Sequence, residues 1–316
     1  MARFKGGERD VLTDVSVVVE SYNHGEGSSL QRLALALRAA TDAIDDHGEG
    51  EVLVADSSRD PALSELLERE FPRVRIVVAD GCAYDDSKMK AAAEARGQFV
   101  LYLDGDCIPA PGWLESHLQV LRDGALATTG LTRYDGGFLG AVQTVMDFGF
   151  LLPAGRRPVP CYAFNNSAFR REVFQETPIP QGPMRCGCYA HAQLLQQAGT
   201  PVQMVPEARV RHERPPFFKE RFRQGFDLVA ACWTNPKLRE GALLRAGPFA
   251  APVFYARAVV KDLRRLTLGR RDIGLRAWQV PFAALLLPCF RLVDLAGIVR
   301  ALAPGGREVF AERGAG

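Results

Sequence analysis

Two aspartates separated by one glycine follow an apolar run in the segment FVLYLDGDCIPAPGWL (99–114). The run from Phe99 to Leu103 has the pattern of a strand that a parallel sheet buries on both faces. Asp104 and Asp106 would then lie together at the carboxyl end of a core strand. A nearby cation must offset their charge, or one of the two carboxyl groups must have a raised pKa.

A divalent cation is one way to offset this charge. Carboxylate oxygens are hard ligands that suit Mg²⁺ or Mn²⁺, and Gly105 lets the chain bend so that both aspartates can reach one ion. The alternative is a solvated turn in which the two aspartates only cap the backbone, because Asp-x-Asp is a common sequence.

Strand and helix patterns alternate along the first hundred residues. Apolar runs predict strands at 15–21, 51–58, 74–80 and 98–104, and helical spacing predicts helices at 30–44, 61–71 and 85–97. Ser28 or Ser29 can cap the first helix, Pro61 can begin the second, and Gly97 can end the third. This alternation predicts an α/β fold with a doubly wound, mainly parallel sheet and helices on both faces.

Polar side chains follow the predicted strands where each one ends. In doubly wound sheets a ligand sits outside the carboxyl ends of the strands, where these side chains would converge. A diphosphate with a divalent cation is the natural occupant of such an acidic rim. The residues concerned are Glu20, Ser21, Asp56, Asp80, Asp104 and Asp106.

Composition places the chain among ordinary globular proteins. Of its 316 residues 47% are hydrophobic and 24% are charged, and the segment MARFKGGERDVLTD lacks the apolar core of a signal peptide. Seven scattered cysteines, an odd number, favour a reducing compartment over a disulfide scaffold. Cys186 and Cys188 have no second pair and no histidines at the spacing of a structural zinc site.

The charge is divided unevenly. Residues 214–316 contain 18 Lys and Arg against 8 Asp and Glu, a net +10, whereas residues 1–213 carry −8. We therefore expect one unit at 1–213 and a second, basic helical region at 214–316.

Five segments of the chain together resemble the inverting family 2 glycosyltransferases, which have the GT-A fold. The likeness extends over about residues 14 to 213, with its motifs in the family's order. It implies a nucleotide-sugar donor, a divalent cation (Mn²⁺ or Mg²⁺) and a hydroxyl acceptor. The segments that carry it are VSVVVESYNHGEG, EVLVADSSRD, KMKAAAEARGQFVLYLDGDCIPAPGWL, FNNSAFRREVF and AGTPVQMVPEARVRHE.

Carried over position by position, the resemblance assigns a role to most of the rim. Asp106 would bind the metal directly, and Asp104 would lie nearer the ribose or the metal. Lys88 would approach the phosphates, with a solvated lysine on a helix face as the alternative. His212 would approach the metal or the diphosphate, with an interface histidine beside Glu213 as the alternative. The residues facing the nucleotide would be Glu20, Ser21, Asp56 and Asp80.

Two departures from the family pattern concern the start of the chain and the chemistry. Glu20 stands where the family usually has proline. Members also carry Glu-Asp at the start of a later helix, where the aspartate deprotonates the acceptor, and these positions fall on Gly187 and Cys188. A Cys188 thiolate would depend on Arg185 to lower its pKa.

The general base is therefore left open between two catalytic candidates, His191 and Asp135. His191 lies one turn after Cys188 and has a suitable intrinsic pKa, and Asp135 follows the acceptor-side strand. A retaining mechanism, which does not need the family's aspartate, is the alternative to inversion.

The basic region has the features of a membrane surface segment. PPFFKERFRQGF (215–226) mixes aromatic and basic residues, and RAVVKDLRRLTLGRR (257–271) is a basic amphipathic helix. AWQVPFAALLLPCF (277–290) is apolar for only about thirteen residues after Trp278, whereas a span needs about twenty. We expect a peripheral position at the cytoplasmic face. A soluble helical appendage or a homodimer surface is the alternative, and no nucleic-acid motif is present.

The sequence thus predicts a metal-dependent glycosyltransferase, with a UDP-sugar as the favoured donor. The expected acceptor is a hydroxyl on a lipid-linked or cell-envelope glycan or on a small molecule. One alternative is a GT-A protein that has lost turnover and only binds a nucleotide. The other is a nucleotidyltransferase, disfavoured because no glycine-rich, lysine-bearing loop follows the first strand.

Overall fold

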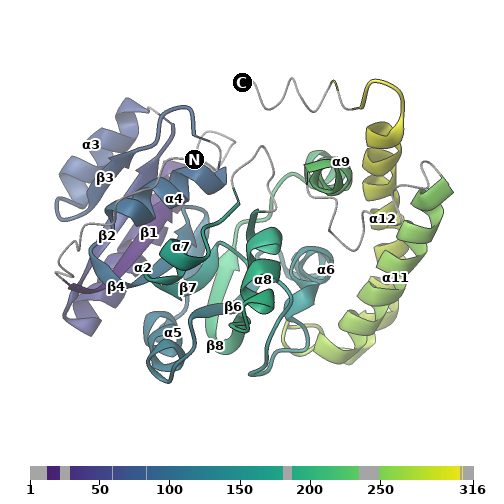
Figure 1. The fold of residues 1–316 in the computed structure, drawn as a ribbon. Helices are drawn as coiled ribbons and strands as arrows, with labels where there is room; N and C mark the ends of the chain where they lie inside the picture. Colours follow the sequence, from purple (N-terminus) through teal and green to yellow (C-terminus); the bar gives the residue numbers. More distant parts are fainter. Residues whose placement is uncertain are drawn as a thin grey trace.

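The computed structural model describes residues 13–21, 29–58, 60–82, 84–180, 187–234, 249–306 and 308. Within these ranges the chain forms one mixed sheet with helices on both faces and a group of helices after it (Figure 1). Arg185, Cys186, Ser28 and most of the loop after the first strand lie outside the described residues.

Among the described residues, eight strands form a single sheet in the order β3-β2-β1-β4-β7-β6-β8-β5. The half β3-β2-β1-β4 is parallel throughout. In the other half β7 is antiparallel to both β4 and β6, β8 is parallel to β6, and the short β5 is antiparallel to β8. The strands are β1 (Thr13–Glu20), β2 (Gly50–Asp56), β3 (Arg75–Val78), β4 (Gly97–Asp104), β5 (Cys107–Pro109), β6 (Ala127–Tyr134), β7 (Asn166–Arg170) and β8 (Gln203–His212).

Helices cover both faces of the sheet, as predicted for a doubly wound fold. Alternate residues of β1 point to opposite faces, so Val17 packs into one apolar core and Val18 into the other. The first core is completed by α2 (Leu30–His47), α3 (Pro61–Glu70) and α5 (Trp113–Arg122). The second is completed chiefly by α4 (Tyr84–Glu94), α6 (Gly137–Asp147) and α8 (Gly187–Gln197), with the one-turn α7 (Val173–Glu176) and η1 (Gly149–Leu151) beside them.

Local signals set most helix boundaries. Ser29 caps α2, accepting a hydrogen bond from the Arg32 amide at 3.2 Å, and Asp60 caps α3 ahead of Pro61. Gly97, in contrast, does not end the third helix, which stops at Glu94; it begins β4 instead. A Cβ there would lie 2.4 Å from the Ser16 amide nitrogen, so only glycine lets β4 approach β1.

The basic region forms the helices α9 (Phe217–Thr234), α11 (Ala250–Gly269) and α12 (Val280–Leu302), with the single turn η3 (Ala277–Gln279) before α12. α9 packs with Ala251 of α11 and Ile298 of α12 in a small third apolar cluster, and α11 and α12 also reach the second core. Leu266 of α11 and Leu287 of α12 are buried in the same core as the sheet. In Figure 1 α11 and α12 stand side by side at one edge of the molecule, next to α6.

Buried ion pairs join these helices to one another and to α6. Arg221 of α9 binds Asp147 of α6 at 2.5 Å and Asp294 of α12 at 3.0 Å. Arg291 of α12 in turn binds Asp262 of α11 at 2.6 Å. Because charges this deeply buried must be paired, the network fixes which helix faces meet.

Candidate active site

The carboxyl ends of the parallel strands bring the predicted rim together. Glu20 of β1 is in register with Asp104 of β4 on one side and with Ala55 of β2, the residue before Asp56, on the other. Glu20 and Asp104 are buried, and Asp56 is half-buried. Three acidic side chains therefore end three neighbouring strands at one edge of the sheet.

Ser21 and Asp56 form a local hydrogen-bonded unit at this edge. The Ser21 hydroxyl donates to Asp56 Oδ1 at 2.9 Å, and the same oxygen accepts the amide and hydroxyl of Ser58 at 2.8 and 2.7 Å. These contacts hold one oxygen of Asp56 in place. Asp80, which follows β3 at the outer edge of the sheet, is exposed.

A tight turn carries the chain from Asp104 to Asp106. The Gly105 amide donates to the Glu20 carbonyl at 2.9 Å, which ties the turn to the end of β1. A Cβ on Gly105 would lie 2.7 Å from Leu33 Cδ1 and 2.8 Å from the Glu20 carbonyl oxygen. Glycine is required here because neighbouring groups occupy the space of a side chain.

Asp104 is neutralised by a side chain from α4. Lys88 is fully buried and forms an ion pair with Asp104, and the Tyr84 hydroxyl lies 2.8 Å from both oxygens of that carboxylate. Lys88 also donates to the Tyr84 hydroxyl at 2.6 Å. Lys88 is thus not a solvated lysine on a helix face. Its predicted approach to the phosphates stays a prediction.

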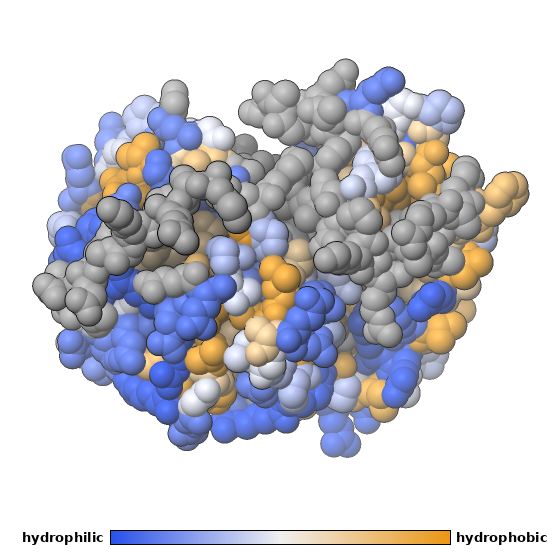
Figure 2. Space-filling model, viewed as in Figure 1, coloured by the Kyte–Doolittle hydropathy of each residue, from blue (hydrophilic) through white to orange (hydrophobic). Residues whose placement is uncertain are grey.

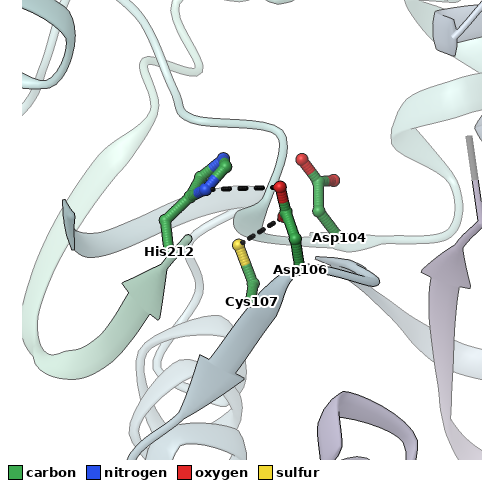
Figure 3. A group of neighbouring side chains, drawn as sticks. All are labelled: Asp104, Asp106, Cys107 and His212. Atoms are coloured by element: carbon green, nitrogen blue, oxygen red, sulfur yellow. Dashed lines mark hydrogen bonds and ion pairs between the residues drawn. The ribbon is translucent and has the colours of Figure 1, made fainter. Parts of the chain in front are cut away.

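Asp106 and His212 meet where β5 pairs with β8. Cys107 is in register with His212, and His212 Nδ1 lies 3.5 Å from Asp106 Oδ2. Figure 3 shows Asp106 between His212 and Asp104, with the Cys107 thiol beside it. One ligand atom from each of these four residues lies within 4.8 Å of the others.

Burial raises the pKa values of two groups in this cluster. It raises the pKa of Asp106, while the neighbouring His212 charge opposes that rise. Burial, together with the adjacent Asp106 and Asp104, raises the pKa of the Cys107 thiol well above its usual value. Cys107 therefore remains a thiol, positioned to donate to Asp106 Oδ1 at 3.5 Å.

The donor set fits a divalent cation that prefers oxygen and imidazole ligands. Two carboxylates and one imidazole suit Mn²⁺ or Mg²⁺, whereas a protonated thiol is a poor ligand for either. Asp106 and His212 would be the direct ligands, because Asp104 is already held by Lys88 and Tyr84.

Asp135, the first predicted base, lies near this cluster but is engaged in ion pairs. Its carboxylate binds Arg32 Nη2 at 2.8 Å and lies 3.7 Å from Arg211 Nη1. Arg32 also donates to the Asp106 carbonyl at 3.1 Å. Asp135 lines a cavity of about 360 Å³ that Arg276 and Gln279 also border.

His191, the second predicted base, lies in the apolar core instead of the site. It is fully buried, with Nδ1 3.0 Å from the Tyr162 hydroxyl and Nε2 2.7 Å from the Thr177 carbonyl. Burial lowers its pKa to about 4. The geometry argues against His191 as the base, because both ring nitrogens are already hydrogen-bonded within the protein.

Two contributors to the site were not predicted from the sequence. Tyr84 lies one turn before Lys88, and that spacing of four on a helix is the signal that could have paired them. Arg32 links Asp135 to the backbone of Asp106, and no pattern in its own helix distinguishes it from Arg38, the other arginine of α2.

The sequence model described as Glycosyl transferase family 2 matches residues 16–177, about half of the chain. The chain belongs to this family. The match runs from β1 to the short α7 and includes Asp104 and Asp106. It ends before α8 and His212, and before the basic region.

Individual relatives agree with this assignment. Polypeptide N-acetylgalactosaminyltransferase 12 of Mus musculus is 31% identical over 120 residues, which are 36% of this chain. The chain spans about a fifth of the length of that relative, since the match covers 20% of it.

The solved structure of a mannosyltransferase confirms the predicted GT-A fold. The mannosyltransferase PcManGT from Pyrobaculum calidifontis, in complex with GDP-Man and Mn²⁺, superposes with a TM-score of 0.59 at 16% identity, covering 92% of this chain and 88% of that one. GalNAc-T7 with UDP, GalNAc and Mn²⁺ gives a TM-score of 0.49 at 17% identity, covering 66% and 45%.

Proposed function

We propose that this protein is a metal-dependent glycosyltransferase that moves a sugar from a nucleoside-diphosphate sugar to a hydroxyl acceptor. The observation that carries the proposal is the cluster of Asp104, Asp106 and His212 at the carboxyl ends of the sheet. Family membership and the fold shared with PcManGT support it.

Each part of the site has a task in this reaction. Asp106 and His212 would hold the cation, which would supply positive charge against the departing diphosphate. Lys88 and Tyr84 fix Asp104, so its position does not depend on the ligand. Glu20, the Ser21–Asp56 unit and Asp80 face the nucleotide. The site thereby places donor and acceptor for in-line attack, and inversion is the favoured outcome.

A UDP-sugar is the favoured donor, and GDP-mannose is the main competitor. UDP follows from the family resemblance, and the curated relative of this chain is an N-acetylgalactosaminyltransferase. PcManGT, which shares the fold over most of both chains, was solved with GDP-Man. The proposed acceptor is the hydroxyl of a lipid-linked or cell-envelope glycan.

The C-terminal helices would place the enzyme on a membrane. Most of the large apolar side chains exposed among the described residues belong to this C-terminal region, and Figure 2 shows hydrophobic surface at the edge of the molecule where α11 and α12 lie. These side chains are Phe218, Phe249, Val253, Val260, Leu268, Trp278, Phe282, Leu285, Leu292 and Val299. Exposed basic residues beside them, including Lys261, Arg264, Arg271 and Arg276, favour anionic lipid.

We propose that α12 lies along the membrane surface. Residues 277–302 are long and apolar enough to cross a membrane, and their most apolar 18-residue window has a mean hydropathy of 2.0. One face of this helix, however, carries Arg291 and Asp294 in buried ion pairs with α11 and α9. The opposite face presents Leu285, Leu292 and Val299 at intervals of seven residues. Because these ion pairs hold one face of α12 against the protein, only its other face can meet lipid, which fits an interfacial position at the cytoplasmic face.

Thermal stability with added nucleotides tests the donor site. We would measure Tm with UDP, GDP, ADP and CDP, each with and without Mn²⁺, for the wild type, Asp106→Ala and the exposed control Asp46→Ala. Ligand that binds only the folded state raises Tm. One nucleotide should raise Tm in the wild type and in Asp46→Ala only when Mn²⁺ is present, and Asp106→Ala should lose this shift.

The outcomes separate the competing functions. The absence of a shift with every nucleotide would overturn the glycosyltransferase proposal. Specific binding without transfer or hydrolysis of the matching nucleotide sugar would instead favour the nucleotide-binding protein that has lost turnover. Release of pyrophosphate from a nucleoside triphosphate would favour a nucleotidyltransferase.

A further inference from the structure

A buried carboxylate from α4 lies at the start of α8. Asp85 is 6% exposed, and its Oδ2 accepts a hydrogen bond from the Gly187 amide at 3.0 Å. Its Oδ1 is buried and has no hydrogen-bond partner among the described residues. A buried carboxylate oxygen in this state can still accept a hydrogen bond, so it is suited to meet a hydroxyl group.

The glycine at position 187 makes room for this carboxylate. A Cβ on Gly187 would lie 2.3 Å from Asp85 Oδ2, so any other residue would push the acid away. Gly187 and Cys188 are also the positions where the family resemblance leads one to expect Glu-Asp. The structure therefore supplies an acid to the same helix end from a different element, α4.

The same helix connects Asp85 to the metal cluster. Tyr84 and Lys88 of α4 both bind Asp104, and Asp85 lies on the face of Lys88, three residues before it. Burial raises the pKa of Asp85 to about 6, against the lowering effect of the Lys88 charge. A carboxylate with a pKa near the working pH can both accept and release a proton.

The other candidate bases are less available. His191 has both nitrogens hydrogen-bonded in the core, and Asp135 is bound by two arginines. The hydrogen bond with Cys161, together with burial, raises the pKa of the Cys188 thiol well above its usual value, so it remains protonated.

We propose that Asp85 is the catalytic base that deprotonates the acceptor. This inference rests on the proposed function, with inversion at the anomeric carbon. The acceptor O–H proton passes to Asp85 Oδ1 while the oxygen forms a bond to the anomeric carbon. The bond from that carbon to the diphosphate oxygen breaks, and its electron pair leaves with the nucleoside diphosphate. Asp85 then releases the proton to water.

Asp85→Asn tests this role, because asparagine can keep the hydrogen bond to the Gly187 amide. We would measure hydrolysis and transfer with the sugar nucleotide whose diphosphate raises Tm with Mn²⁺. The variant should lose activity by about 10²- to 10⁴-fold, the usual contribution of a general base. The Tm shift with the nucleoside diphosphate and Mn²⁺ should stay unchanged. Asp86→Asn, one residue along the same helix, is the matched control and should change activity little.

Rescue and pH dependence separate catalysis from a structural role. Asp85→Asn combined with Cys188→Asp returns an acid to the start of α8. The double variant should be at least tenfold more active than Asp85→Asn alone. In the wild type kcat/KM should fall below pH about 6 as Asp85 is protonated, and Asp85→Asn should lack this acid limb.

Two results would overturn the assignment while leaving the proposed function intact. The first is near-normal transfer by Asp85→Asn; inactivation by Asp135→Asn in the same assay would then move the base to Asp135. The second is a loss of nucleotide binding that matches the loss of activity, which would indicate a structural role. A wild type that binds no nucleotide would instead overturn the proposed function itself.

Discussion

At the scale of single residues, Lys88 is the internal counter-charge of the site. It is fully buried, and its ammonium lies against Asp104 and over the Tyr84 ring, 4.1 Å from the ring centroid. A buried ion pair contributes little net stability when it is complete, but removing one partner leaves an uncompensated charge. The protein itself therefore fixes the position of Asp104, and a cation held by Asp106, as proposed above, would meet a preformed rim.

Lys88→Met should therefore be strongly destabilising. The buried Asp104 would lose its partner, and we expect the free energy of unfolding to fall by about 3–5 kcal/mol in metal-free buffer. Chemical denaturation would measure this change. Adding Asp104→Asn to Lys88→Met removes the stranded charge and should recover much of the loss. If the loss of unfolding free energy in the double variant equalled the sum of the losses in the two single variants, Lys88 and Asp104 would not be coupled as the structure indicates.

Asp85 should lower stability at neutral pH, although its hydrogen bond caps α8. Its pKa rises from 3.8 to about 6 on folding, so the folded state binds this proton more tightly than the unfolded state does. Protonation of Asp85 therefore stabilises the folded state. This contribution is complete below pH 3.8 and is lost as the pH rises through about 6, which leaves the protein less stable at neutral pH. This rise in the pKa corresponds to about 3 kcal/mol in the free energy of unfolding.

Asp85→Asn should consequently gain stability relative to the wild type as the pH rises. The difference in free energy of unfolding between the two proteins should grow between pH 4 and pH 6 and level off above pH 7. Urea titrations at several pH values would measure it, with Asp86→Asn as the control. A difference that does not vary with pH would show that Asp85 does not titrate as its burial implies.

At the scale of elements, the sequence predicts the parallel half of the sheet, in which strands and helices alternate along the chain. Apolar runs and capping residues such as Ser29 and Pro61 predicted β1 to β4 and the helices between them, because those signals are local. His212 at the end of β8 came from the family resemblance, and the structure places it beside Asp106. The antiparallel partners of β4 and β8 depend on contacts between distant segments, which periodicity does not report.

Site residues held by long-range contacts were harder to predict. Lys88 could be read as a solvated lysine because helix spacing does not reveal that Asp104 is opposite it. His191 could be read as a base because its burial depends on Phe169, Phe174 and Tyr162, which come from elsewhere in the chain. Asp85 carries no sequence signal that separates it from its neighbour Asp86, because its contact with Gly187 spans 102 residues.

The crossing of α9 and α12 is an element-scale feature with a sharp test. A Cβ on Gly225 would lie 1.9 Å from the Asp294 carbonyl oxygen, so the two helices touch backbone to backbone. Gly225→Ala should force them apart and lower Tm, with a cost of about 1–3 kcal/mol or more. Gly155→Ala is the matched control, because a Cβ there meets nothing within 4 Å. Equal Tm values for the two variants would contradict this packing.

At the scale of the whole molecule, the C-terminal helices have two different faces. The inner face is polar where Arg221, Arg291 and their aspartates lock α9, α11 and α12 onto α6. The outer face carries the exposed apolar and basic side chains. A soluble appendage gains nothing from this arrangement, whereas a protein that acts on a lipid-linked acceptor would use it to stay beside its substrate.

Vesicle binding should therefore depend on the outer face of α12 and on anionic lipid. Leu285 and Leu292 are 72% and 52% exposed, and changing both to Gln removes apolar surface without touching the ion pairs. We expect Leu285→Gln/Leu292→Gln to weaken sedimentation with phosphatidylglycerol vesicles at least tenfold, since each buried leucine contributes about 1.5–3 kcal/mol. Leu35→Gln on α2, 48% exposed in the wild type, is the control and should bind normally. Binding that survives the double substitution but is lost in high salt would assign the contact to the arginines alone. A dimer in solution that the same double substitution dissociates would show that this face joins two copies of the chain.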